Sequence, residues 1–370
     1  MAVESVWSEI GNRVKQARLA AGFSQEELGA KTRLDRTMIV KIEAGTRRMD
    51  AMELARIGAS LQVPIDRLLQ DPPLVVSRRN GLETEEVGVA ESAGYRADTV
   101  LFSWLRDVRQ LIDIRQLCVR TVLQYPGAVK QSSDARIAAQ WLRDRLDLGI
   151  GPTGSLMTVG ESAGLLFAVE PLNDPKDGFH DGAAVHDGEV AVSVVDVRSD
   201  FNRRRTTAAH ELGHIVLGDE YASDIGVHAS KNEREAVIEA FASEFLLPGA
   251  AVAVPDGILR RSALVKLAAE YKVSWSLAVL QAGLTGVLDE REVRRWRRET
   301  PTRADFMDAL GWSPQPDLEK VRVPPSVAKG IMGSYREGLI TKARAVEMMR
   351  GHIKEHELPD FDHEEDDVEP

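Results

Sequence analysis

The sequence predicts a mainly α-helical protein with one small β-sheet. Two observations carry this prediction. Apolar residues recur with the period of an amphipathic helix over the first 70 residues and again after Arg205. Between Leu156 and Val197 the pattern instead becomes that of β-strands, rich in β-branched residues. We therefore expect an all-α N-terminal domain, an α+β central domain and a helical C-terminal region.

Bulk composition narrows the class of protein. The chain has 370 residues, enough for two or three domains. Its formal net charge of -11 argues against coating nucleic acid by bulk electrostatics, so any DNA contact must come from a local patch. The single cysteine, Cys118, excludes an internal disulfide and a cysteine-rich metal cluster.

Targeting signals are not apparent in the sequence. The N-terminal residues lack the basic start and apolar run of a secretory signal. No stretch approaches the ~20 consecutive apolar residues that a membrane-spanning helix needs. We therefore expect a cytoplasmic protein that makes no contact with a membrane.

Glycine, proline and charge patterns divide the chain into six segments. Pro72-Pro73 closes the first unit, and a stretch rich in Gly, Glu and Ser follows it. The predicted segments are a compact helical unit (7–72), a linker (73–97), a connecting helix (98–132), the α+β domain (133–290), a helical C-terminal region (291–355) and an acidic disordered tail (356–370).

Five short helices are predicted in the first unit. Gly22 ends the first helix, and the spacing from Ser24 to Glu27 is that of a capping box that starts the second. The remaining three are expected at Asp35–Ala44, Ala51–Leu61 and Pro64–Leu69.

Two strands and a series of helices are predicted in the central domain. The strands are Leu165–Val169 and Val190–Val197, and Asp187-Gly188 is a turn signal between them. The helices are expected at 133–148, 206–217, 233–246, 262–271, 274–284 and 289–298, with weaker ones up to residue 350.

A cluster of metal-ligating residue types lies in the helix predicted over 206–217. His210 and His214 are four residues apart, so both side chains can point at one ion. Zinc lowers the pKa of a bound water towards ~7, and a neighbouring carboxylate such as Glu211 can take the proton as that water attacks a carbonyl. The pattern therefore predicts a zinc hydrolase site with Glu211 as general base.

A catalytic zinc site needs a third protein ligand. The next helix offers Glu235 and Glu239, four residues apart on one face. We assign Glu235 as the ligand and Glu239 as a partner that accepts a proton from a ligand histidine, although the reverse assignment stays open. The strand Val190–Val197, which precedes the motif, could form the edge that binds substrate.

The segment RRRTTAAHELGHIVLGD, followed by EREAVIEAFASEFLLP, resembles the ImmA/IrrE family of metallo-endopeptidases. The resemblance covers roughly 133–290 and implies a zincin-like metallopeptidase domain. The family often has Asn or Asp where Glu239 stands, which favours Glu235 as the ligand, and Val237 departs from a commonly polar position. The matching positions are Arg205, Ala209, His210, Glu211, His214, Glu235, Phe241, Ala242, Leu246 and Pro248.

The first unit, from VKQARLAAGF to IEAGTRR, resembles the lambda-repressor-like (XRE-type) helix-turn-helix. The resemblance implies that the third helix enters the major groove of DNA. It places Arg36, Thr37 and Val40 at base edges. It places four further residues at phosphates or the flanking groove: Gln25, Lys41, Arg47 and Arg48. Arg33 stands where the turn usually has Gly, at some cost to the backbone.

Together the two resemblances imply a DNA-associated regulatory zinc endopeptidase that cleaves a protein partner. The implied partner is a transcriptional repressor or an antitoxin, with a role in the stress response. Double-stranded DNA is a second expected partner, and residues 301–350 could cover the cleft or form a homodimer. The alternative is a transcription regulator or toxin–antitoxin component whose metal domain senses or binds without cleaving.

Overall fold

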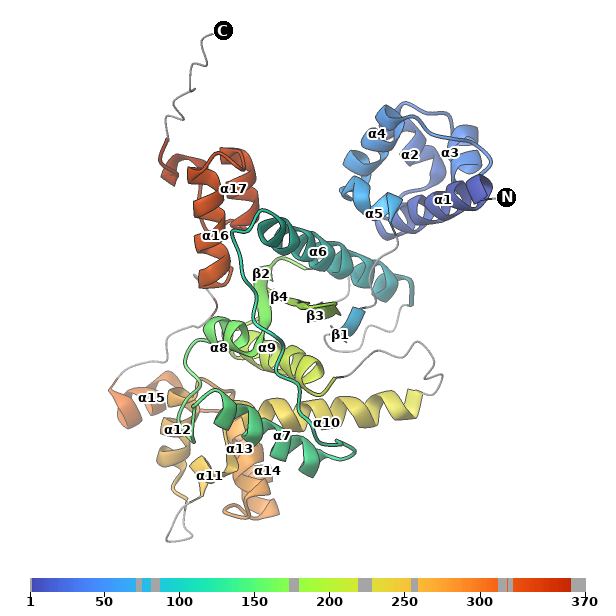
Figure 1. Cartoon of the computed structure of the whole chain (residues 1–370). Helices are drawn as coiled ribbons and strands as arrows, with labels where there is room; N and C mark the ends of the chain where they lie inside the picture. The colour runs from blue at the N-terminus through green and yellow to red at the C-terminus, as the bar shows by residue number, and fades with distance from the viewer. Residues whose placement is uncertain are drawn as a thin grey trace.

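The computed structural model describes residues 2–70, 75–80, 87–172, 180–218, 228–253, 259–311, 318 and 322–360. It has a helical N-terminal domain beside a layered body, in which one sheet lies between helices (Figure 1). Helices predominate and the sheet has four strands, so the predicted fold class is confirmed. Among the described residues, no helix is long and apolar enough to cross a bilayer.

Five helices form the N-terminal domain, as predicted. Ser24 accepts a hydrogen bond from the amide of Glu27 and Glu27 caps the Ser24 amide, which completes the expected capping box. Arg33 adopts the left-handed conformation, with φ of 60°, at the C-terminus of the second helix. The helices are α1 (Ala2–Ala20), α2 (Gln25–Thr32), α3 (Arg36–Glu43), α4 (Ala51–Leu61) and α5 (Ile65–Leu69).

The sheet combines parallel and antiparallel pairs in the order β1-β3-β4-β2. β3 and β4 form an antiparallel hairpin that turns at Gly188, where φ is 64°, so the predicted turn is confirmed. β4 also pairs in parallel with β2. The strands are β1 (Val75–Asn80), β2 (Leu165–Glu170), β3 (His180–Asp187) and β4 (Val190–Asp196).

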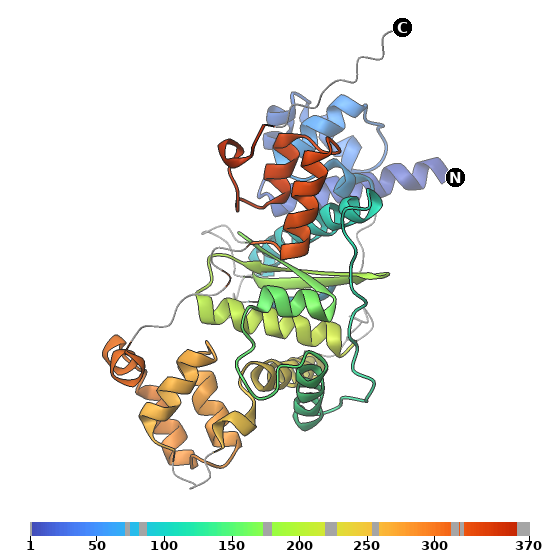
Figure 2. The same ribbon diagram turned by 60° about the vertical axis from the view of Figure 1, so that its left-hand side comes forward.

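Helices cover both faces of the sheet, as the two views show together (Figures 1 and 2). Each face has its own hydrophobic core, which is why every residue of β4 is buried. One core includes α6 (Val87–Asp113), α16 (Pro325–Arg336) and α17 (Lys342–Met348). The other includes α7 (Ser132–Arg145), α8 (Leu156–Ala163), α9 (Phe201–Val216) and α10 (His228–Leu246).

A group of short helices extends the second core away from the sheet (Figure 2). Tryptophans 275 and 296 stack there, with ring centroids 6.2 Å apart. The helices are α11 (Gly249–Val252), α12 (Arg261–Glu270), α13 (Trp275–Leu284), α14 (Glu290–Arg298) and α15 (Arg303–Leu310).

The predicted linker and connecting helix differ from the structure. The range 73–97 holds strand β1 and the start of α6, and α6 ends at Asp113 rather than near residue 132. Arg115 has a φ of 61°, which stops the helix. The chain then runs without helix or strand to residue 131 and bonds to the body, for example from the Tyr125 amide to the Val216 carbonyl at 2.8 Å.

Three further expectations are corrected. β4 is an interior strand, so the prediction that Val190–Val197 forms the substrate-binding edge is wrong. The predicted C-terminal region 291–355 is two parts, since α14 and α15 join the second core whereas α16 and α17 pack on α6. The predicted tail begins too early, because Leu358 is buried among the apolar residues of α16 and α17; residues 361–370 lie outside the described residues.

Candidate metal centre

Helix α9 carries the His-Glu motif through the middle of the body. The Asp200 side chain caps the helix by accepting a hydrogen bond from the Arg203 amide. Every residue from Thr207 to Val216 is buried, because the sheet covers one side of the helix and α10 the other. The two histidines are therefore held in a packed interior.

Three side chains meet at one point between α9 and α10. His210 Nε2 lies 3.1 Å from Glu235 Oε2 and 3.1 Å from His214 Nε2. The candidate ligand atoms of all three residues lie within 4.8 Å of one another. Ligands that stand ~2.0–2.1 Å from a zinc ion in tetrahedral geometry are about 3.3 Å apart. The two-nitrogen, one-oxygen set therefore fits a zinc ion.

The exposure of the three residues is unequal. His210 and His214 are 1% and 3% exposed, whereas the Glu235 side chain is 34% exposed. The site is therefore closed on the α9 side and accessible from α10. Glu239 lies one turn further along α10 and is also exposed; of the two glutamates, only Glu235 is in the cluster.

Glu211 is completely buried beside this cluster. The hydroxyl of Ser77, on strand β1, donates a hydrogen bond to its Oε2. Its other oxygen faces Gly182 of β3: a Cβ added there would lie 3.3 Å from Oε1. The carboxylate that the sequence predicts as general base thus lies between α9 and two strands of the sheet.

Two glycines allow the close packing around this helix. A Cβ on Gly182 would come 2.6 Å from Thr207 Cγ2 and 3.0 Å from the carbonyl oxygen of Val194. A Cβ on Gly213 would come 2.9 Å from the ring of Phe241 on α10. Both contacts are too short for a real side chain, so glycine sets the distances from α9 to β3 and to α10.

Two arginines near the N-terminus of α9 hold the helix against neighbouring segments. Arg205 is buried and donates to the carbonyl of Gly154 and the hydroxyl of Thr153, both at 2.9 Å. Arg203 pairs with the buried Asp181 of β3, and hydrogen bonding to that carboxylate raises the pKa of the guanidinium. The first contact ties α9 to the loop before α8, and the second ties it to the strand that carries Gly182.

Sequence reasoning missed Ser77 and Gly182. Both lie in strands that were not predicted, β1 and β3. The pair Val75-Val76 was a weak signal for β1, since two β-branched residues precede Ser77.

The residues predicted to contact DNA form two groups in the N-terminal domain. Arg36, Thr37, Val40, Lys41 and Arg48 are exposed, the first four along α3. Arg47 and Gln25 instead make internal contacts. Arg47 donates two hydrogen bonds to Glu53, at 2.7 and 2.9 Å, and Gln25 Nε2 donates to Glu43 at 2.8 Å.

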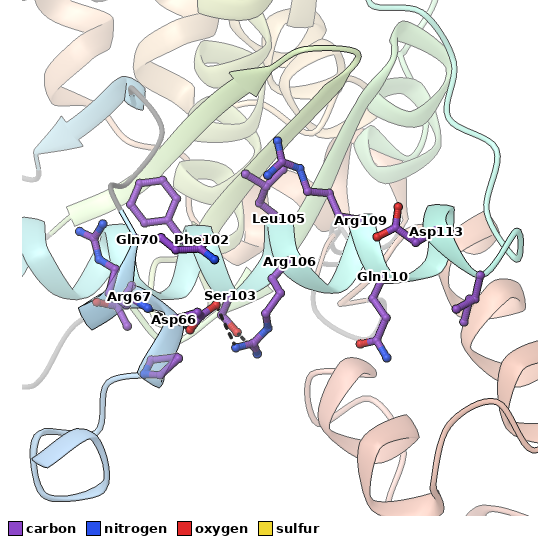
Figure 3. A pocket seen from close by; sticks show the side chains of 13 residues that line it. Asp66, Arg67, Gln70, Phe102, Ser103, Leu105, Arg106, Arg109, Gln110 and Asp113 are labelled. Carbon is purple, nitrogen blue, oxygen red and sulfur yellow. Dashed lines mark hydrogen bonds and ion pairs between the residues drawn. The ribbon is translucent and has the colours of Figure 1, made fainter. Parts of the chain in front are cut away.

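A groove of about 420 Å³ lies where the N-terminal domain meets α6 (Figure 3). Arg67 of α5 lies over the Phe102 ring of α6, 4.5 Å from its centroid, and 3.7 Å from Asp98. Arg106 approaches Asp66 at 3.5 Å. The groove lies on the opposite side of the sheet from the His–Glu cluster, because α6 and α9 cover opposite faces.

Comparison with known proteins gives two domain matches and several relatives. Residues 176–281 match the IrrE N-terminal-like domain, and residues 14–68 match the helix-turn-helix. An "Uncharacterized HTH-type transcriptional regulator" of Sinorhizobium medicae (strain WSM419) is 36% identical over 64 residues, which is 17% of this chain and 46% of the relative. A relative of like description from Rhizobium meliloti (strain 1021) has the same figures.

A third relative is matched over most of its length. The "Uncharacterized transcriptional regulator in ATPase CF(0) region" of Rhodospirillum rubrum is 33% identical over 92 residues, which is 25% of this chain and 85% of the relative. The chain thus spans about half the length of the first two relatives and most of the third. No solved structure matches the chain. The chain thus carries a helix-turn-helix domain over residues 14–68, and over residues 176–281 it is similar to the IrrE N-terminal-like domain.

Proposed function

We propose that this chain is a DNA-associated regulatory zinc endopeptidase that cleaves a protein partner, such as a transcriptional repressor. The observation that carries the proposal is the cluster of His210, His214 and Glu235 within 4.8 Å, with the carboxylate of Glu211 beside it. A metal sensor needs ligands but no general base. The buried carboxylate next to the ligand set therefore favours catalysis.

The chain's own residues supply binding and proton transfer. A zinc ion held by His210, His214 and Glu235 would lower the pKa of a water and polarise the carbonyl of the scissile peptide. Glu211 takes the proton of the attacking water and delivers it to the departing amine, so the proton balance closes over one turnover. The packing of α9 holds the two histidines in place before any ligand arrives.

The proposed cleavage activity is tested with the variant Glu211→Gln. Removal of a general base costs about 10²–10⁴-fold in rate. We expect the variant to keep its zinc, measured by elemental analysis, and to lose cleavage, measured by proteomics of cells that express either form. Proteins encoded by neighbouring genes are the first candidates for substrate. An unchanged product pattern would rule out the enzymatic function.

The proposed binding to DNA rests on the exposed side of α3, which presents Arg36, Thr37, Val40 and Lys41. A double variant Arg36→Ala, Thr37→Ala should weaken promoter binding by about 1–3 kcal/mol per lost base contact. Arg295→Ala, an exposed arginine of α14, serves as the control for a simple loss of positive charge. Normal binding by the double variant would contradict readout by α3.

The alternative is a transcription regulator or toxin–antitoxin component whose metal domain binds without cleaving. All three relatives are named as transcriptional regulators, which favours this alternative. The same Glu211→Gln variant separates the two. It should leave gene regulation intact if binding alone matters, and it should abolish regulation if cleavage is required.

A further inference from the structure

Strand β1 occupies an edge of the sheet directly beside the candidate metal centre. It pairs antiparallel with β3, and β3 would be the edge strand without it. An exposed sheet edge is a common place for an extended peptide to bind, because the peptide completes the backbone hydrogen bonds of the edge strand. Here a segment of the same chain already fills that place.

The side chain of Ser77, on β1, reaches into the site. The Ser77 hydroxyl donates to Glu211, and Ser77 is 1% exposed. A general base must lie within hydrogen-bond reach of the water that attacks the scissile carbonyl. The residue of β1 that bonds Glu211 therefore stands in the space that a reacting peptide and its water would need.

An irregularity in β1 aims Ser77 at the site. The register with β3 shifts between Val75 and Ser77, as in a β-bulge. Val75 packs against the core on the α6 side, whereas Val76 belongs to the core on the α9 side and Ser77 contacts Glu211 of α9. Two successive side chains thus face α9, which regular alternation would not allow.

The strand is also joined directly to the N-terminal domain. α5 ends at Leu69 and β1 begins at Val75. α5 contacts α6 through Arg67, which lies 4.5 Å from the centroid of the Phe102 ring (Figure 3). Arg67 also lies 5.2 Å from the centroid of the Tyr95 ring. Only residues 70–74 separate α5 from β1 along the chain, so the strand is the first element of the body after the N-terminal domain.

We infer that β1 is an internal inhibitory strand: it holds the place of an extended peptide substrate along β3, and Ser77 caps the general base until the strand is displaced. This inference rests on the proposed peptidase function and adds its regulation. The substrate is then a protein segment in extended conformation that pairs antiparallel with β3. Cleavage requires that β1 leaves the edge first.

One variant should lock the strand and another should release it. Val75 and Val185 are partners across β1 and β3 and lie on the same side of the sheet. Directly opposed residues of antiparallel strands have Cα atoms about 4.5–5.5 Å apart, which suits a disulfide. The locked form is Val75→Cys, Val185→Cys with Cys118→Ser. Val76→Asp, which puts a charge among apolar side chains, is the release form.

The measurement is cleavage of unfolded casein by zinc-loaded full-length protein. Val76→Asp should raise the rate about tenfold or more, as expected when a closed state that dominates is opened. The oxidised double-cysteine form should fall to background and recover when tris(2-carboxyethyl)phosphine reduces it. The matched control is Val185→Cys with Cys118→Ser, which should not respond to oxidation.

Hydrogen–deuterium exchange shows whether the strand has moved. In Val76→Asp, faster exchange should be confined to β1 and β3, which separates release from unfolding. Equal cleavage by the oxidised and reduced double-cysteine forms would overturn the inhibitory role and leave the peptidase function standing. No cleavage by any form, with zinc bound and β1 released, would overturn the peptidase function and the inference with it.

Discussion

The N-terminal domain and the candidate metal centre are built in opposite ways. In the first domain, α2 and α4 begin at capping boxes of their own, and the buried residues of its small core lie within residues 14–68. The metal centre instead gathers residues from distant segments, namely Ser77, Gly182, Glu211 and Glu235. The residues expected to contact DNA therefore lie mainly on one helix, whereas the metal centre depends on the packing of the whole central domain.

The largest expected effect tests whether the N-terminal domain is independent. Arg18 and Glu43 form a buried pair at 2.6 Å between α1 and α3, with side chains 8% and 4% exposed. Glu43→Ala leaves a buried charge and should cost about 3–5 kcal/mol of unfolding free energy. DNA binding should be lost while zinc content stays constant. A parallel loss of zinc would show that the two regions fold as one unit.

The second prediction separates the two glutamates of α10. Loss of a partner outside the ligand set typically lowers metal affinity about 10–100-fold. Glu235→Ala should lower zinc affinity by more than that range, because it removes a candidate ligand. Glu239→Ala should stay at or below it. Both are measured by zinc titration against a chelator. Full zinc retention by Glu235→Ala together with loss in Glu239→Ala would move the ligand to Glu239.

The third prediction tests the close approach of β3 to α9. Gly182→Ala introduces a Cβ 2.6 Å from Thr207 Cγ2, an overpacking that should cost about 1–3 kcal/mol. The shift should displace Glu211 and lower cleavage, with little change in DNA binding. Gly188→Ala in the neighbouring turn is the control, because a Cβ there meets no atom within 4 Å, although its positive φ adds strain. A normal cleavage rate in Gly182→Ala would contradict the packing argument.

The smallest effect concerns a contact that joins local and distant partners. Three hydrogen bonds lower the pKa of Asp305 from 3.8 to about 2. The largest effect comes from the backbone amide of Thr302, the next from the Thr302 hydroxyl and the third from the Arg261 guanidinium. A carboxylate with a lowered pKa stabilises the fold above its ordinary pKa, and this stabilisation is lost as pH falls from about 4 to about 2. Asp305→Asn should therefore flatten the pH dependence of thermal unfolding in that window. If Asp305→Asn left the pH dependence of thermal unfolding unchanged, the stabilising role of the Asp305 carboxylate would be contradicted.

Sequence reasoning succeeded where the signal lies within a few residues. The capping box at Ser24, the stop at Gly22 and the turn at Gly188 are local devices, and all were predicted. Reasoning failed at β1, a strand of six residues in a polar stretch. The C-terminal end of α6 was not predicted either. Arg115 adopts a left-handed conformation there, which is uncommon for arginine and so is not expected from the sequence.

The sequence by itself determined the class of the protein, the helix with His210, Glu211 and His214, and the helix-turn-helix. Helical spacing and capping are properties of neighbouring residues, so no tertiary information is needed to see them. Only the tertiary structure decided which strand lies at the sheet edge. It also decided that Glu235 is in the histidine cluster and that Ser77 meets Glu211. These contacts join residues separated by 21 or more positions. They follow from the packing of α9 against α10 and against the sheet, which no local pattern encodes.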